Sequence, residues 1–391
     1  MNKIKGALDL KKEILRENLC TACGACVGLC GYFGTFQGRV VMLDSCELTE
    51  GRCYAFCPRT KTDNRRIRTQ FFDQNDLHPD IGPCRGLYMT RAIDEKIRAG
   101  SQHGGTVTAL LKLAMEEGFI DAAILTRSAG GLNPHGVLVS RTEDVEKCAG
   151  SSFQIAPSLA ILNQALKENQ HKRIGVVGTP CKTLAVYKMK SYYQINNDEN
   201  MNKIPLVIGL FCGWGLEWLG LEKVMKRWAL DEDVLHIDFP PSKYQIMEIQ
   251  TRRKRIEVPL NEIYEVIKES CNYCPDLTAE FSDLSVGGSR SSKGWDFDRG
   301  WNQVIVRTIN GEELLKTAKE KKVLEFHEIE SQNIDKLKRA HIGKRNKAVQ
   351  NILKRTGTRS DLSYLDLEDA VLESCLEDAI RGMNEIAKKV E

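Results

Sequence analysis

The sequence predicts a protein of mixed α+β and α/β class, and three observations support this prediction. Seven of the fourteen cysteines fall between residues 20 and 57. From about residue 86, short apolar segments alternate with helical patterns, which is typical of α/β layers. The last sixty or so residues have a helical pattern, with a basic segment followed by an acidic one. We therefore expect a cysteine-rich module over 1–80, an α/β body over 81–330 with parts 81–165 and 166–330, and a helical tail over 331–391.

The N-terminal module opens with four cysteines at the spacing of bacterial ferredoxins: Cys20, Cys23, Cys26 and Cys30. In that pattern three thiolates hold one iron–sulfur cluster and the fourth reaches the other cluster. The proline that normally follows the fourth cysteine is replaced by Gly31, and it appears instead in Cys57-Pro58. The spacing predicts a ferredoxin-like module that transfers electrons one at a time.

The second half of the module is irregular, since it reads Cys46-x6-Cys53-x3-Cys57. If the ferredoxin crossover holds, Cys57 completes the first cluster with Cys20, Cys23 and Cys26. Three cysteines then remain for a second cluster, one ligand short: Cys30, Cys46 and Cys53. Cys84 or a non-cysteine donor would supply the fourth ligand. Two clusters are favoured here, and the alternative is a single cluster with the remaining cysteines structural.

Zinc sites and disulfides also use cysteines in numbers. Zinc sites usually have two CxxC pairs separated by a longer spacer, and disulfides require an oxidising compartment. Residues 1–19 are charged and amphipathic without the apolar core of a signal peptide, so we expect a cytoplasmic protein. The net charge of +3 gives no reason to expect nucleic acid. The apolar stretch 204–221 holds Glu217 and four glycines, and does not predict a membrane span.

The body is expected to contain strands at 87–91, 122–126, 137–140, 174–177 and 206–211, with helices at 107–117 and 157–168. Beyond residue 232 the pattern is richer in β-structure, with strands expected at 234–239, 244–251, 256–259 and 304–308. A further helix is expected at the N-terminus, within 1–19, and residues 64–85 have the composition of a polar linker.

Three motifs in the body carry chemistry. The glycine-rich loop 100–106 enters a helix, and its backbone N–H groups would suit a nucleotide pyrophosphate or a simple helix-capping turn. In 176–181 a strand ends at a glycine, after which Thr179 can cap a helix that starts at Pro180. This places Cys181 in the first turn, as a metal ligand, a nucleophile or a buried small residue. The Cys271-x2-Cys274 pair needs two more ligands, for which Cys181 and Cys212 are the candidates.

The body resembles the beta subunit family of coenzyme F420 hydrogenases and dehydrogenases over about residues 82–330. The matching stretches are GGTVTALL (104–111), AGSS (149–152), GTPC (178–181), GLFC (209–212), CNYCPDLTAE (271–280), DLSVGG (283–288) and VIVR (304–307). Each stretch is weak by itself, but their order is specific. The sequence departs from the family at Lys182, where relatives often have glutamine, and in 296–301, which reads as an insertion.

The resemblance implies a non-Rossmann FAD site and one [4Fe-4S] cluster in the body. The implied flavin contacts are Gln102, Gly104, Gly105, Thr106, Gly150, Ser151, Ser152, Thr179 and Pro180. The implied cluster ligands are Cys181, Cys212, Cys271 and Cys274. Together with the N-terminal module, the protein would carry two or three [4Fe-4S] clusters.

These features predict an oxidoreductase subunit that exchanges a hydride with a soluble carrier, either the reduced deazaflavin coenzyme F420 or NAD(P)H. Single electrons would then pass through the clusters to or from a partner subunit or a ferredoxin, and the charged tail would help to dock the protein in a larger complex. Two alternatives stay open: a stand-alone ferredoxin-dependent flavin reductase of an organic substrate, and a non-redox iron–sulfur or zinc scaffold. No acid–base residue is assigned, because His103 is expected to face solvent or cap a helix.

Overall fold

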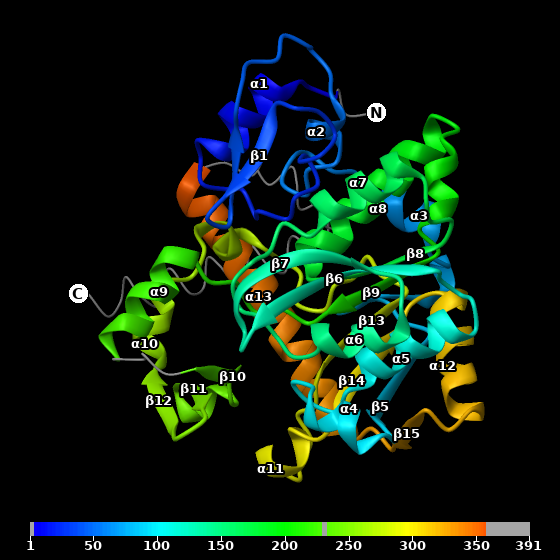
Figure 1. The fold of residues 1–391 in the computed structure, drawn as a ribbon, viewed down its shortest axis with the longest axis vertical. Coiled ribbons are helices and arrows are strands. Elements are labelled where there is room, and N and C mark those ends of the chain that lie inside the picture. Colours follow the sequence, from blue (N-terminus) through cyan, green and yellow to red (C-terminus); the bar gives the residue numbers. More distant parts are fainter. Residues whose placement is uncertain (1–3, 229–232, 357–391) are drawn as a thin grey trace.

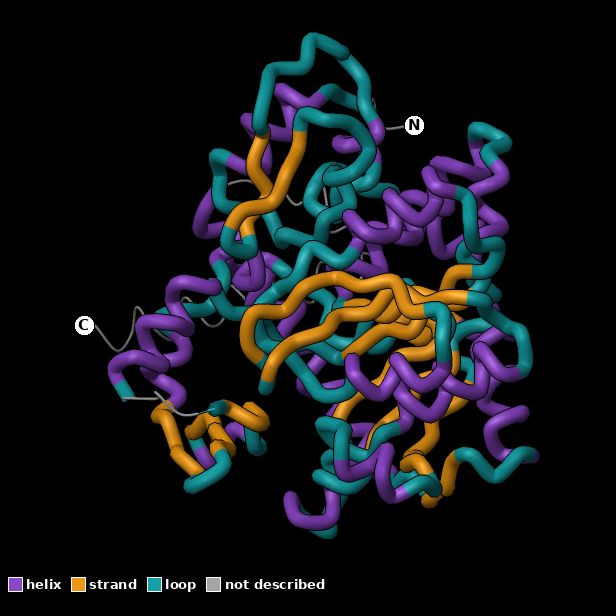
Figure 2. The backbone as a smooth tube through the Cα atoms, in the orientation of Figure 1, coloured by secondary structure: helices purple, strands orange, loops and turns teal. Residues whose placement is uncertain are grey.

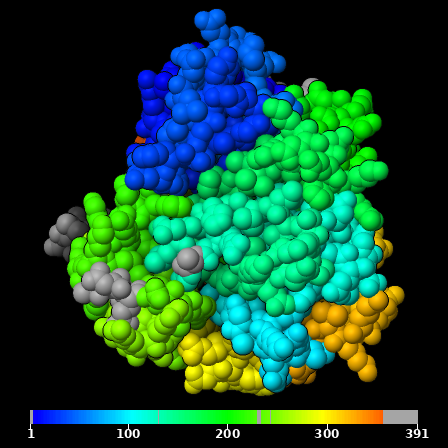
Figure 3. Space-filling view, in the orientation of Figure 1, coloured from blue at the N-terminus to red at the C-terminus, as the bar shows by residue number. Residues whose placement is uncertain are grey.

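The computed structural model describes residues 4–228 and 233–356. An N-terminal module stands at one end of a larger body, whose centre is a mixed eight-stranded sheet (Figures 1 and 2). A smaller three-stranded sheet lies beside the body, and the space-filling view shows the module as a separate lobe (Figure 3). The mixed α/β class expected from the sequence is confirmed.

The central sheet has the order β15-β5-β14-β13-β9-β8-β6-β7. Four adjacent strands run parallel: β13 (Leu284–Gly288), β9 (Leu206–Leu210), β8 (Ile174–Gly178) and β6 (Ala122–Ala129). The outer strands pair antiparallel: β15 (Leu324–His327), β5 (Gly86–Ala92), β14 (Asn302–Val306) and β7 (Leu132–Val139). The carboxyl ends of the four parallel strands therefore meet along one edge of the sheet.

Helices cover both faces of this sheet because its middle strands are apolar on both faces. In β9, Leu206 and Ile208 belong to one core and Val207 to the other, as the alternation of side chains along a strand requires. The first core is closed by α5 (Thr106–Glu116) and α12 (Ile309–Glu320). The second is closed by α7 (Leu159–Glu168) and α8 (Pro180–Ile195).

The small sheet has its own apolar core. It consists of β10 (Val234–Asp238), β11 (Ile246–Thr251) and β12 (Arg255–Pro259), all antiparallel. Two helices pack against it, α9 (Trp218–Arg227) and α10 (Leu260–Tyr264). This unit forms one border of the central cavity, because Asp238 and Phe239 at the end of β10 line it.

The N-terminal module is built from α1 (Ala7–Leu10), a π-helical turn at Lys11–Leu15, the hairpin β1 (Phe33–Phe36) and β2 (Arg39–Met42), and α2 (Arg52–Ala55). Its cysteine loop sits directly on the body. The Leu159 N–H donates to the Cys23 carbonyl at 3.1 Å, and Asn163 donates to two further carbonyls of the loop. At Gly24 the backbone has φ +89° and a Cβ would lie 2.5 Å from the Pro157 carbonyl oxygen, so only glycine fits there.

The linker expected over 64–85 contains a helix and two short strands. Residues Asn64–Phe71 form α3, which packs on α8 through an edge-to-face contact of Phe71 with Tyr187. Two-residue strands follow at Leu77–His78 (β3) and Gly82–Pro83 (β4). The polar composition was misleading here, because α3 buries only a narrow face containing Ile67. The remaining short helices are α4 (Glu95–Ala99), α6 (Thr142–Val145) and α11 (Trp295–Asp298), of which α11 coincides with the expected insertion.

The helical tail begins as expected, but its described part packs on its own chain. Helix α13 (Ser331–Thr356) crosses the body, with Lys344 donating to the Cys212 carbonyl at 2.6 Å. At the far end of the helix, Arg355 donates to Glu17 of the N-terminal module. The acidic segment of the tail lies outside the described residues. Within residues 4–228 and 233–356, none of the helices combines the length and apolar character needed to cross a membrane.

The strand predictions of the body are confirmed, with shifts at their ends. Strand β7 begins earlier than expected, at Leu132, and β14 begins at Asn302. Strands β13 and β15 and the hairpin β1–β2 were missed. The hairpin strands were missed because they are short. Strand β13 was missed because it ends in two glycines and carries a serine, which do not make a clear strand pattern.

Candidate functional site

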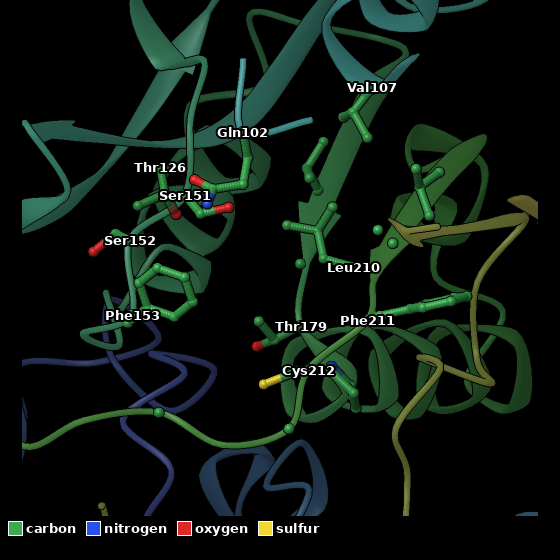
Figure 4. Close-up of a pocket in the computed structure, with 18 of the residues that line it drawn as sticks. Gln102, Val107, Thr126, Ser151, Ser152, Phe153, Thr179, Leu210, Phe211 and Cys212 are labelled. Carbon is green, nitrogen blue, oxygen red and sulfur yellow. The ribbon is translucent and has the colours of Figure 1, made fainter. Parts of the chain in front are cut away.

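A cavity of about 530 Å³ opens at the carboxyl ends of the parallel strands. Thr126 of β6, Gly178 of β8, Leu210 of β9 and Gly287 of β13 all line it (Figure 4). In open α/β sheets, ligands bind at this edge, because the strands end there and the following loops diverge. Apolar surface dominates the lining, and a few polar side chains converge on it, as is typical of a cofactor site.

Eight of the nine residues expected to contact a flavin line this cavity: Gln102, Gly105, Thr106, Gly150, Ser151, Ser152, Thr179 and Pro180. They come from three separate loops, and Figure 4 shows Ser151 and Ser152 on one side of the cavity with Thr179 on another. Gly104 is the exception. It is a buried residue of the glycine-rich loop, and an added Cβ there would lie 3.0 Å from Arg91 and from Asn302.

Several of these residues already have partners within the protein. The Thr106 hydroxyl shares a hydrogen bond with Thr90 at 2.8 Å, and its backbone N–H donates to the Asn302 side chain. The Thr106 N–H at this helix start is therefore not free. The Ser152 hydroxyl donates to the Gly131 carbonyl. Thr179 occupies the N-cap position of α8 but makes no capping hydrogen bond, and its hydroxyl lies 3.4 Å from the Cys181 sulfur.

Two polar atoms of the glycine-rich loop have no partner in the described residues. They are Oε1 of Gln102 and Nδ1 of His103, both buried. The Gln102 amide nitrogen donates to Asp238 at 2.7 Å and so ties the loop to β10. The expectation that His103 faces solvent or caps a helix is wrong. Its side chain lines the cavity, its ring packs edge-on against Trp295, and burial lowers its pKa to about 4.

The four cysteines expected to hold the body cluster all line the same cavity: Cys181, Cys212, Cys271 and Cys274. They come from the first turn of α8, the end of β9 and the turn at Glu269–Tyr273. The thiols of Cys271, Cys181 and Cys274 are all within electrostatic range of Cys212, whose pKa is raised mainly by burial. The Gly215 N–H donates to the Cys271 sulfur at 3.2 Å.

The N-terminal cysteines separate into two groups. Cys20, Cys23, Cys57 and, with the smallest effect, Cys53 are charge neighbours of Cys26, and burial is the main cause that raises the pKa of the Cys26 thiol. The second group is centred on Cys53, and Cys30 and Cys46 are its charged neighbours. Burial raises the pKa of the Cys53 thiol to about 11. The two groups adjoin, because Cys53 is also a charge neighbour of Cys26, and the ferredoxin crossover stays a prediction. The charged neighbours of Cys84 are instead Arg307, Asp76 and Lys338, so it lies with the body and does not complete the second group.

Buried cations surround the first N-terminal group and the body group, and no sequence motif indicates them. The Arg59 guanidinium donates to the carbonyls of Ser270 and Tyr273, beside Cys271 and Cys274. The Lys188 ammonium donates to the Cys57 carbonyl at 2.6 Å. Lys344 donates to the Cys212 carbonyl from helix α13. The two thiol groups also approach one another, because Cys181 is a charge neighbour of Cys23.

A cofactor-sized cavity at the strand ends, walled by four cysteines and adjoining further cysteines, defines an oxidoreductase subunit. The chain belongs to the coenzyme F420 hydrogenase/dehydrogenase beta subunit family. The model of the N-terminal part of that family matches residues 87–163, and the model of its C terminus matches residues 171–332. Helix α13, with Lys344, lies beyond the matched residues for nearly its whole length.

Relatives and a solved structure agree with this assignment. The chain is 26% identical over 280 residues to the beta subunit of coenzyme F420 hydrogenase from Methanothermobacter thermautotrophicus, covering 70% of this chain and 96% of that one. It is 28% identical over 310 residues to one subunit of the F420H2 dehydrogenase from Methanosarcina mazei, covering 77% and 82%. A chain of the F420-reducing [NiFe] hydrogenase complex from Methanosarcina barkeri superposes with a TM-score of 0.65 at 26% identity, covering 72% and 95%.

Proposed function

We propose that this protein is a flavin and iron–sulfur subunit that exchanges a hydride with coenzyme F420 and passes single electrons to or from a partner subunit. The observation that carries the proposal is the single cavity shared by the flavin-loop residues and the four cysteines of the body. F420 is favoured over NAD(P)H because these relatives and the solved structure are all named for it.

The cavity suits FAD in three respects. Its volume of about 530 Å³ is in the range of cofactor sites. Buried atoms of Gln102 and His103 have no partner in the described residues and so are available to a polar ring edge. At Gly150 the backbone has φ +89° and an added Cβ would meet nothing within 4 Å, which leaves this backbone open towards a ligand.

The group around Cys26 in the module and the four cysteines of the body, together called the two inner thiol groups, suit iron–sulfur clusters. In the residues that the structure describes, no three His, Cys, Asp or Glu side chains lie close enough together to hold a single metal ion. In a [4Fe-4S] cluster each thiolate binds a different iron, so its four ligands are spread more widely than those of one ion. A thiolate-bound cluster is anionic, and the buried Lys188 and the partly buried Lys344 supply compensating charge beside the thiols.

The proposed ligands are Cys181, Cys212, Cys271 and Cys274 in the body, and Cys20, Cys23, Cys26 and Cys57 in the module. Cys30, Cys46 and Cys53 are proposed to hold a second module cluster with a non-cysteine fourth ligand. Since Cys30 is exposed, this outer site faces the surface where a redox partner would approach.

When bound, FAD accepts an electron pair as a hydride and the clusters carry electrons singly. The protein's own residues hold these sites at a constant separation. Arg59 ties the loop after Cys57 to the turn that carries Cys271 and Cys274. Lys188 fixes the Cys57 loop onto α8, the helix whose first turn carries Cys181. These contacts dock the module on the body beside the proposed body cluster.

The test is anaerobic purification followed by measurement of flavin, iron and sulfide per chain. We expect one FAD and about eight to twelve irons. Reduced F420 should then bleach the flavin absorbance faster than NADH. Zinc in place of iron, with no flavin retained and none bound on addition of FAD, would overturn the proposal and leave a metalloprotein scaffold. Bleaching by NADH alone would overturn only the choice of carrier.

A further inference from the structure

Lys182 is a buried lysine whose ammonium lacks adequate partners. It lies in the first turn of α8, is 5% exposed and lines the central cavity. Within the described residues, its hydrogen bond runs from Nζ to the Thr126 hydroxyl at 3.5 Å, the limit of such a contact. Thr126 lines the cavity together with Gln102 and Ser151 (Figure 4). The Lys182 ammonium therefore lies at the cavity wall.

Other interior lysines of the described chain have closer oxygen partners or, for Lys190, aromatic rings around the ammonium group. Lys188 has four oxygen partners, three of them within 2.9 Å. Lys190 lies over the rings of Phe71 and Tyr187. Lys268 pairs with Glu217 at 2.9 Å, and Lys344 donates to two carbonyls. An ammonium has three donors, and a buried charge without acceptors is strongly unfavourable. With this one long hydrogen bond, the Lys182 ammonium has donors available to a ligand of the cavity.

The neighbours of Lys182 indicate which end of a cavity ligand it meets. The charges nearest to it are the thiols of Cys181, Cys23 and Cys212, which belong to the two inner thiol groups. A flavin that passes electrons to these groups must place its ring, and not its phosphates, at this end of the cavity.

We propose that the Lys182 ammonium contacts the pyrimidine edge of the bound flavin ring, where it stabilises the negative charge of the reduced flavin. This inference rests on the proposed function, since it requires FAD in the cavity. It makes Lys182 a cofactor-contacting residue that sets the reduction potential of the flavin.

The experiment compares Lys182→Met, Lys182→Gln and Lys182→Arg with the full-length holoprotein. Spectroelectrochemical titration gives the flavin midpoint potential, and equilibrium dialysis against FAD gives its affinity. In the methionine variant, we expect the ratio of affinities for reduced over oxidised flavin to fall at least about tenfold. This corresponds to a shift of the flavin midpoint potential by about 30 mV to more negative values. The arginine variant should stay near the wild type, and the glutamine variant should fall with methionine because it also lacks the charge.

The matched control is Lys190→Met, which removes another buried lysine of α8 that does not line the cavity. Its flavin potential should equal that of the wild type, and thermal melting of every variant reports on folding. If Lys182→Met weakens FAD binding without moving the potential, the contact is to phosphate and the proposal is overturned. A shift confined to the cluster potentials overturns it as well. A wild-type protein that binds no FAD defeats the proposed function itself, whereas an unshifted potential in a flavin-loaded variant defeats only the role of Lys182.

Discussion

The Arg59 guanidinium donates a buried hydrogen bond to the Tyr273 carbonyl at 3.0 Å. Arg59 follows Cys57 and Pro58 in the N-terminal module, and Tyr273 precedes Cys274 in the body. This contact, which spans 214 residues of sequence, joins the two loops that carry the inner cysteines.

Arg59→Met should loosen the module from the body. The variant leaves the carbonyls of Ser270 and Tyr273 without this donor, and hydrogen bonds from charged groups contribute about 1.5–3 kcal/mol each. We expect a lower melting temperature, easier proteolysis between the module and the body, and slower electron transfer between clusters in freeze-quench EPR. Arg141→Met serves as the control, since Arg141 makes only exposed ion pairs and its loss should change none of these quantities.

Serine substitutions test the crossover of the N-terminal cysteines. Cys57→Ser should remove the same cluster as Cys20→Ser, because both belong to the group around Cys26. Cys53→Ser should remove a different cluster. Each loss should be about four irons per chain, measured by iron assay and by the EPR signal that disappears. If Cys57→Ser and Cys53→Ser eliminate the same signal, the two-group arrangement is wrong.

His341 of α13 should make the protein sensitive to acid. Burial lowers its pKa to about 3, whereas in the unfolded chain it titrates near 6.5. Between these values the unfolded chain binds the additional proton, so the free energy of unfolding falls as the pH drops from about 6.5 towards 3, by up to about 1.4 kcal/mol per pH unit. The difference in the free energy of unfolding between pH 7.5 and 5.5, measured with denaturant, should be smaller in His341→Gln than in the wild type. His78→Gln, at a partly exposed histidine, is the control and should behave as the wild type.

Gly150→Ala should weaken FAD binding more than it affects the fold. An alanine is strained at φ +89°, at a cost of about 1–2 kcal/mol, although its methyl group would meet no neighbour. We expect the loop to shift and the flavin content to drop, with a melting temperature close to that of the wild type. Gly343→Ala is the paired variant, because Gly343 lies in the interior of α13 with free space around it and should become slightly more stable. Undiminished flavin in Gly150→Ala would remove this loop from the proposed site.

Much of the fold was predictable from the sequence because the signals are local. The strands of the body carry continuous apolar runs, and the start of α8 at Pro180 follows from the residue types at a helix N-terminus. Where local pattern is weak, prediction failed. Strand β13 has serine and glycine at three of its five positions, and its pairing with β9 and β14 decides its structure.

The residues proposed to bind cofactors were chosen without coordinates, the cysteines from their spacing and the flavin contacts from the family resemblance. The electrostatic environment of those residues arises from folding alone. Arg59, Lys188 and Lys344 belong to no motif, and each comes to lie beside thiols of another segment only when distant parts of the chain pack together. A lysine is usually an exposed residue, so its burial, and the need for a compensating negative group that burial creates, is a property of the folded chain.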